Sequence, residues 1–285
     1  MELLSHSDAS AFLRRARRWL ERAEDEHNLI LGLAAALAGG DGHDGADAPW
    51  FATVEEDDRV VGCAFRTPPH KVGVTRMPLD AASLVAEEVA RRFEEIPGFM
   101  GPPSLAEAAA EAWVRRRGGA AVHGMEMRIH RLDRVEHAGD APGRMRQATG
   151  EDLPLAADWA DGFARDTGAS FRSEEATRRA WVAAGQLWLW EDDEPACMAV
   201  ARGRTRHGVR IGYVYTPPER RRRGYASRLV AALSQRMLDD GLRFCVLYTD
   251  LANPTSNAIY RRIGYRPVCD VTDVMVEPDP RPRAG

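Results

Sequence analysis

The sequence predicts an α/β (α+β) protein in which a mixed, mostly antiparallel central sheet is flanked by helices. Three observations support this fold class: helix-period and strand-period segments alternate, their order repeats in the two halves, and a polar segment over 134–142 separates the halves. The 285 residues suffice for two ordinary domains. We therefore expect two tandem copies of one fold, over 1–135 and 143–276, with a Pro-rich mobile tail over 277–285. The alternative is one continuous domain whose element order repeats by coincidence.

Apolar residues at three- and four-residue steps predict the helices of the first half, and alternating runs predict its strands. Asp8 is the expected N-cap of the first helix, and Gly118-Gly119 ends a later one. The expected elements are a helix over 8–37, a loop over 38–49, strands over 50–55 and 60–66, a short strand over 72–76, a helix over 80–93, a turn-rich segment over 95–103, a helix over 104–117 and a strand over 121–132.

The second half shows the same order of helices, hairpin, third strand, helix, strand, helix and strand. Thr149 and Asp152 have the spacing of a capping box at the start of its first helix. The expected elements are a strand over 145–148, helices over 149–164 and 173–185, hairpin strands over 187–191 and 196–202, a strand over 209–215, a helix over 225–239, a strand over 244–248, a helix over 253–263 and a last strand over 267–276.

The composition indicates a soluble globular protein, because 44% of the residues are hydrophobic, 29% are charged and the formal net charge is −4. That charge disfavours a dedicated nucleic-acid binder, whose domain is usually basic. No apolar run approaches the roughly 20 residues of a membrane span, and no secretory signal is evident, so we expect a cytoplasmic protein. The four cysteines form no CxxC pair. We expect buried free thiols and no metal site.

The segment over 213–230 is the most informative part of the chain. It reads as a strand, a turn with four consecutive arginines, and the start of a helix at Tyr225. A helix N-terminus offers unpaired N–H groups to a phosphate, and Gly224 lets a ligand approach the backbone. Arginine is nevertheless the default cation here, since Lys71 is the only lysine. A solvated arginine face or a nucleic-acid patch would give the same run.

The turn resembles the acetyl-CoA pyrophosphate loop of the GNAT N-acetyltransferase superfamily. The family pattern is Arg or Gln, two variable residues, Gly, one variable residue, and Gly or Ala. It is met by Arg221, Arg222-Arg223, Gly224, Tyr225 and Ala226. A second GNAT-like pattern follows one helix and one strand later, in Asn253, Tyr260, Gly264 and Tyr265. The register between the two patterns is more specific than either alone, and the resemblance covers about 143–276.

The resemblance implies an acyl-CoA N-acyltransferase fold and acetyl-CoA as cosubstrate. It implies that Val214, Tyr215 and Thr216 bind the pantetheine arm through their backbone, that residues 221–226 bind the pyrophosphate, and that Asn253 holds the arm. Asn257, one helical turn later, is a second candidate. Tyr260 would donate a proton to the leaving thiolate, which suits a hydroxyl that is protonated at neutral pH. Otherwise Tyr260 is a core tyrosine that packs the last helix on the sheet.

The general base is less evident, since the strand before the turn lacks the Glu that many family members use. Asp250 is the candidate catalytic base, although a helix-capping or turn role explains it better. His207 is another candidate, and a water chain or an already neutral amine would also suffice.

The first half departs from the pattern: its equivalent turn over 75–82 has no such motif, and Asp80 would repel a phosphate. We therefore expect a degenerate GNAT-like first half that does not bind CoA, and an intact GNAT domain in the second half.

The expected function is transfer of acetyl from acetyl-CoA to a primary amine by direct attack. The acceptor is a small-molecule amine or a peptide N-terminus, with no nucleic acid, membrane or metal involved, and the protein is a monomer or homodimer. A non-catalytic CoA-binding regulatory module is the alternative, and a nucleic-acid-binding protein is a further one.

Overall fold

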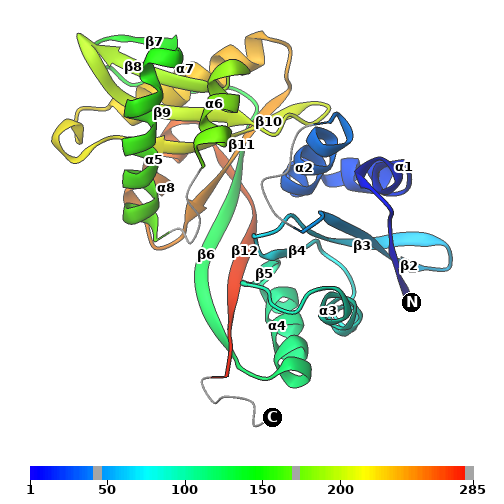
Figure 1. Cartoon of the computed structure of the whole chain (residues 1–285). Coiled ribbons are helices and arrows are strands. Elements are labelled where there is room, and N and C mark those ends of the chain that lie inside the picture. Colours follow the sequence, from blue (N-terminus) through cyan, green and yellow to red (C-terminus); the bar gives the residue numbers. More distant parts are fainter. Residues whose placement is uncertain (41–46, 169–173, 280–285) are drawn as a thin grey trace. The chain divides into compact units, whose positions relative to one another are not determined.

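The computed structural model describes residues 1–40, 47–168 and 174–279, which fall into two compact units (Figure 1). The first unit comprises Met1–Ile129, Asp250–Ala252 and Cys269–Gly285, and the second comprises His130–Thr249 and Asn253–Val268. The end of the chain thus belongs with the first unit, whereas the predicted second domain ran on to residue 276. Residues 41–46 of the expected loop, residue 173 of an expected helix and residues 280–285 of the expected tail lie outside the described residues.

The first unit contains helices on both faces of its strands. α1 and α2 pack against Phe51, Cys63 and Phe65 on one face, and α3 and α4 pack against the opposite face. Its strands follow the order β1-β2-β3-β4-β5-β12, in which β4 and β5 are parallel and the other neighbouring pairs are antiparallel. The elements are β1 (Glu2–Ser5), α1 (Ala9–Leu20), a 3-10 turn (Glu21–Ala23), α2 (Asn28–Ala38), β2 (Trp50–Glu56), β3 (Arg59–Arg66), β4 (Val72–Val74), α3 (Ala81–Arg92), β5 (Gly98–Gly101), α4 (Pro103–Arg117), β6 (Ala120–Leu132) and β12 (Arg266–Glu277).

Two predictions for this unit were wrong. The expected helix over 8–37 is broken between α1 and α2, because polar groups in the break bond locally: the Asn28 side chain donates to the Asp25 carbonyl at 2.7 Å. The segment over 95–103 contains the strand β5, which the turn residues around it concealed. The N-cap was predicted correctly, since Asp8 Oδ1 accepts from the Ala11 amide at 2.7 Å.

The second unit has the same order of elements. Its strands follow the order β11-β10-β9-β8-β7, with β10 and β11 parallel and the other pairs antiparallel. Its capping box is confirmed, because Thr149 and Asp152 bond each other's backbone groups. The elements are β7 (Arg144–Gln147), a 3-10 turn (Gly150–Asp152), α5 (Leu153–Thr167), α6 (Glu175–Ala183), β8 (Leu187–Asp192), β9 (Glu194–Arg202), β10 (Gly208–Tyr215), a 3-10 turn (Pro218–Arg220), α7 (Tyr225–Asp239), β11 (Phe244–Asp250) and α8 (Pro254–Ile263).

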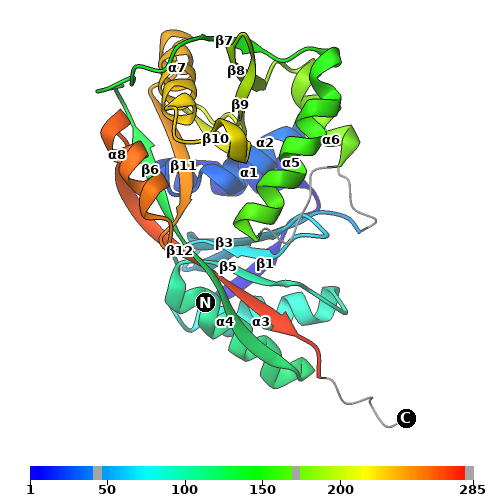
Figure 2. The same ribbon diagram turned by 90° about the vertical axis from the view of Figure 1, so that its left-hand side faces the viewer.

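The helices of the second unit also cover both faces of its strands (Figure 2). α7 and α8 pack on one face through Leu229, Leu233 and Ile263, and α5 and α6 pack on the other through Trp159 and Trp181. The predicted fold class, a mostly antiparallel mixed sheet flanked by helices in two tandem-like halves, is thereby confirmed. Among the described helices, none combines the length and the apolar character that crossing a membrane requires.

Candidate functional site

The strands β10 and β11 pair over only part of their length. Their parallel pairing joins Gly208–Arg210 to Phe244–Val246, after which β10 continues to Tyr215 and β11 to Asp250. The register of β10 against β9 also shifts between Gly212 and Tyr215, where one extra residue is inserted. A β-bulge of this kind redirects a strand and ends its pairing. The second half of β10 therefore has backbone groups that β11 does not pair.

The bulge has two further features of a binding surface. Tyr213 has a φ of 50°, a conformation that non-glycine residues adopt at a cost of about 1 kcal/mol or more. A Cβ added to the neighbouring Gly212 would meet nothing within 4 Å. The opening between the two strands is thus lined by a strained, open stretch of β10.

The turn after β10 leads into an uncapped helix N-terminus. Gly224 has a φ of 80° and stands at the N-cap of α7 without a side-chain cap. The backbone N–H groups of Tyr225, Ala226 and Ser227 donate to none of the residues that the structure describes. A Cβ on Gly224 would meet only Ala141 Cβ, at 3.4 Å. These N–H groups and the positive end of the helix dipole fit an anionic phosphate.

The arginines of this turn have different roles. Arg220 pairs with Glu194, and Arg221 pairs with Asp166 and also donates to the Thr216 carbonyl at 2.9 Å. Arg222 and Arg223 are exposed and pair with no carboxylate in the described part of the chain. Two of the four arginines thus hold the turn in place, and two are available to an anion. This division weakens the nucleic-acid alternative, which needs the whole run to face outward.

The hydroxyl of Tyr225 also serves the structure, since it donates to Asp192 Oδ2 at 2.5 Å. Its side chain is buried, so only its backbone faces the turn.

The three residues predicted to bind a pantetheine arm lie at the open end of β10. Tyr215 is buried and pairs with Met198 of β9, so one edge of its backbone is used. Its hydroxyl packs against Gly162 of α5, and a Cβ at Gly162 would lie 2.3 Å from the hydroxyl oxygen. The Thr216 hydroxyl is buried beside the Cys197 thiol, a weak hydrogen-bond partner. Val214 packs against the core beneath α7.

The two asparagines occupy the first turn of α8. Asn253 is the N-cap, where its Oδ1 accepts from the Ser256 amide at 3.0 Å, and its side-chain N–H groups donate to no described residue. Asn257 Oδ1 accepts from the Thr249 hydroxyl at 2.7 Å, and its Nδ2 donates to the Asn253 carbonyl at 2.8 Å. Asn253 therefore keeps donors for a ligand, whereas Asn257 ties α8 to the end of β11.

Tyr260 lies on α8, half-buried against the core of the second unit. Its ring is 6.0 Å from that of Tyr265, edge to face, and its hydroxyl bonds to no described residue. Burial, with a smaller contribution from the Cys197 thiol, raises the pKa of Tyr260 above its ordinary value. A tyrosine in this setting keeps its proton at neutral pH and has it available for a ligand.

The candidate bases are Asp250 and His207. Asp250 belongs to the first unit, and its Oδ1 accepts from the Ala252 amide at 2.8 Å, as in a turn. His207 precedes β10 at the end where the strand is still paired, and its carbonyl accepts from the Arg243 amide at 2.7 Å. The described strand β10 itself has no carboxylate.

Sequence reasoning missed two arginines that lie among apolar strand residues. Arg202 of β9 and Arg210 of β10 are register partners directly beside the point where β10 and β11 part. Arg210 is buried, with 9% of its surface exposed. The available signal was a charged residue at an inward-facing strand position, which is rare unless the charge has a purpose.

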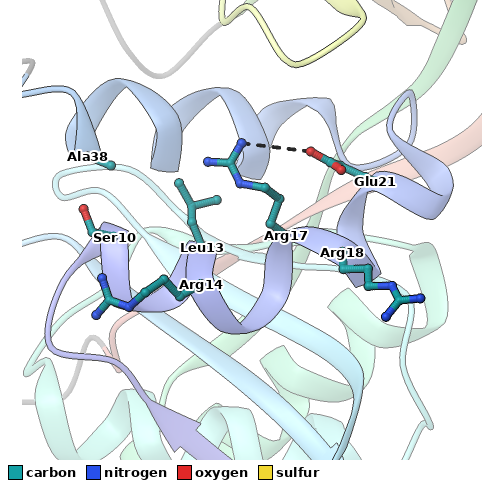
Figure 3. Close-up of a pocket in the computed structure, with 7 residues that line it drawn as sticks. All are labelled: Ser10, Leu13, Arg14, Arg17, Arg18, Glu21 and Ala38. Atoms are coloured by element: carbon teal, nitrogen blue, oxygen red, sulfur yellow. Dashed lines mark ion pairs between the residues drawn. The ribbon is translucent and has the colours of Figure 1, made fainter.

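A shallow pocket of about 420 Å³ on the first unit contains none of the predicted site residues (Figure 3). It lies along α1, where Arg17 reaches Glu21 at 4.0 Å. Its lining is mostly exposed and charged, with Leu13 as the main apolar member, whereas ligand sites are usually apolar and enclosed. Within the described residues, no group of His, Cys, Asp and Glu side chains has the arrangement of a metal site.

Comparison with known proteins gives this arrangement a family. Residues 156–265 match the sequence profile of the acetyltransferase (GNAT) family. The chain therefore contains a GNAT-family domain in its second half, and the parted strands, the α7 turn and Tyr260 all lie within the matched residues. A search of curated proteins finds no match to the sequence.

Solved structures extend the likeness to the whole fold. A Drosophila protein covers 97% of this chain and 98% of its own, with a TM-score of 0.70 and 16% identity. A GNAT-family acetyltransferase from Colwellia psychrerythraea covers 97% and 100%, with a TM-score of 0.60 and 11% identity. A tandem GNAT protein from the clavulanic acid biosynthesis pathway covers 97% and 98%, with a TM-score of 0.57 and 14% identity. At these identities the likeness concerns the fold alone.

Proposed function

We propose that the protein is a CoA-dependent N-acetyltransferase whose activity resides in the second half and whose acceptor is a primary amine. One observation supports this most: β10 parts from β11 just before the uncapped N-terminus of α7, within the residues that match the GNAT family. Unpaired strand groups thus lie next to a turn whose free N–H groups suit a phosphate. Together they suit a long cosubstrate that has a peptide-like arm at one end and a pyrophosphate at the other.

Acetyl-CoA would supply an activated thioester, and the residues of this chain would bind and orient it. The free backbone edge of Val214, Tyr215 and Thr216 would pair with the amides of the arm. The N–H groups of residues 224–226, with Arg222 and Arg223, would bind the pyrophosphate, while Arg221 holds the turn. Asn253 would donate to the arm from the start of α8, and Asn257 would support Asn253.

The reaction needs one new bond, one broken bond and two proton transfers. The amine nitrogen attacks the thioester carbonyl, the C–N bond forms and the C–S bond breaks. Tyr260 donates its proton to the departing sulfur, and the nitrogen loses its proton to a base. The raised pKa of Tyr260 keeps that proton in place until the sulfur leaves. No cysteine is required, since the amine attacks directly.

Proton removal from the amine is assigned less specifically. Asp250 remains the candidate among side chains, although its bond to the Ala252 amide favours a turn role. A water chain, or an amine that arrives neutral, would need no side chain at all.

The first half does not bind CoA in this proposal. Its corresponding turn has Asp80 where the second half has Gly224, and a carboxylate at the start of α3 would repel a phosphate.

The test uses the full chain, acetyl-CoA and a panel of primary amines that includes amino acids, polyamines and short peptides. Acetyl-CoA should raise the melting temperature, and at least one amine should release free thiol together with an N-acetylated product seen by mass spectrometry. Absence of any acyl-CoA binding would overturn the proposal. Stabilisation by acetyl-CoA without acetylation of any amine would favour the regulatory CoA-binding module.

A further inference from the structure

We propose that Arg202 binds a carboxylate of the acceptor, so that the substrate is an amine that also bears a carboxylate. This inference rests on the proposed function and names the acceptor class for the same site. It depends on the position of Arg202, on its surroundings and on the charge beside it.

Arg202 lies where an acceptor would have to be. It ends β9 and pairs in register with Arg210, the last residue of β10 that β11 also pairs. From there β10 runs five residues to Tyr215, about 16 Å at the usual strand rise. If the pyrophosphate lies at the turn after Tyr215, the thioester end of an extended arm points back along β10 toward Arg210, where β10 and β11 part. The amine must approach at that end.

The surroundings of Arg202 form an aromatic wall around a charged group. Its guanidinium carbon is 5.4 Å from the centre of the Trp181 ring and 5.3 Å from that of Tyr213. Those two rings lie 4.7 Å apart, and Phe163 is 5.1 Å from Tyr213. The guanidinium thus contacts rings from α6 and β10, and Phe163 of α5 supports Tyr213 from behind.

The donors of Arg202 make no hydrogen bond within the described residues. The half-buried side chain has five N–H donors, and none of them bonds to a described residue. None of these nitrogen atoms is fully buried without a partner, so the guanidinium can be reached by a ligand. A planar fork of donors matches a carboxylate in a two-bond geometry.

The charged residue beside Arg202 is Arg210, which is a cation like Arg202 itself. Burial and the neighbouring Arg202 lower the pKa of Arg210 to about 10. Burial likewise lowers the pKa of Arg202, and Tyr213 opposes this effect. Arg146 of β7 shows the opposite case: it binds the carboxylates of Asp152 and Glu191, and its pKa is raised. Arg202 would gain a counter-charge of the kind that Arg146 already has if an acceptor carboxylate bound to it.

The experiment measures binding and turnover separately. Binding is measured by calorimetry on CoA-saturated protein with matched product pairs, the N-acetyl derivatives of glycine, leucine and phenylalanine against their carboxamides. At least one acid should bind 10-fold or more tighter than its amide, since a lost charge-assisted pair costs that much or more. The preference should fall to about 2-fold or less in Arg202→Gln and return in part in Arg202→Lys. Arg204→Gln, an exposed arginine two residues on, is the matched control and should keep the full preference.

Turnover gives the second measurement. With the corresponding amino acids and amino acid amides as acceptors, Arg202→Gln should raise KM for the acid at least 10-fold and leave KM for the amide and the acetyl-CoA affinity unchanged. Equal binding of acids and amides by the wild type, or an unchanged preference in Arg202→Gln, overturns the inference. Failure of the proposed function looks different, because acetyl-CoA then neither stabilises the protein nor acetylates any amine. In that case the same acid and amide pairs, titrated into the protein without CoA, still report on Arg202.

Discussion

The turns that follow β4 and β10 hold the same place in the order of elements, yet their backbones differ in two ways. At the start of α7 the first amides have no partner in the described chain, whereas in α3 the Ala81 amide donates to Pro78 at 3.0 Å and the Ala82 amide to Leu79 at 3.1 Å. β10 and β11 separate, whereas β4 and β5 stay together to their ends. A Cβ on Gly101, the last residue of β5, would lie 2.4 Å from the carbonyl oxygen of Val74, the last residue of β4.

In the proposed function, these two backbone differences explain why the first half does not bind CoA. Restoring the phosphate motif to the first half would not be enough, because the strands there leave no room for an arm. Conversely, CoA binding by the second half requires both the free amides at the start of α7 and the separation of β10 from β11.

Gly224→Glu should abolish acetyl-CoA binding. The change puts a side chain where φ is 80° and a carboxylate where the pyrophosphate would bind, and the loss of two or more charge-assisted hydrogen bonds costs about 3 kcal/mol or more. Affinity should fall more than 100-fold by calorimetry. The matched control is Gly118→Glu at the C-terminus of α4, where φ is 82° and no atom lies within 4 Å of an added Cβ. Both variants share the backbone strain, so equal losses of affinity would refute a specific role for Gly224.

Tyr260→Phe should lower kcat by about 100-fold and leave acetyl-CoA affinity within about twofold, since only the proton donor is removed. Stopped-flow or steady-state thiol release measures kcat, and calorimetry measures the affinity for acetyl-CoA. Tyr265→Phe is the control: it removes a buried hydroxyl that bonds to Ser234 at 2.8 Å, so it should cost about 1 kcal/mol of unfolding free energy without lowering kcat. If kcat is unchanged in Tyr260→Phe, Tyr260 is not the acid.

The alkaline side of the pH profile tests the same residue. Because burial raises the pKa of Tyr260, its protonated and active form persists to higher pH than in a free tyrosine, whose pKa is about 10. Below pH 10, we therefore expect the wild-type kcat to show no decline that is absent from Tyr260→Phe. The raised pKa also makes a smaller contribution to the free energy of unfolding. That contribution is complete below pH 10 and is lost as the pH rises beyond it. A Tyr260-dependent decline with a midpoint near pH 8 would contradict this.

Much of the second half was predictable from the sequence, because its local patterns agree with its fold. The bounds of α7 were predicted at 225–239 as found, and the strand, turn and helix around Gly224 have the predicted order. The spacing from Arg221 to Asn253 and Tyr260 gave the family before any geometry was known.

What escaped prediction depends on contacts distant in sequence. β5 is a short strand between turn residues, and its partners β4 and β12 lie far away in the chain. The assignment of residues 269–277 to the first unit follows from that pairing and leaves no local pattern. The parting of β10 from β11, the unused donors of Arg202 and the ion pairs of Arg220 and Arg221 likewise arise only when the elements are packed.

The most direct test of the central claim is the stoichiometry of acetyl-CoA binding by calorimetry on the full chain. The account predicts one acetyl-CoA per chain for the wild type and for an Asp80→Ala variant of the first half, and none for Gly224→Glu. Two sites per chain, or one site that survives in Gly224→Glu, would contradict it.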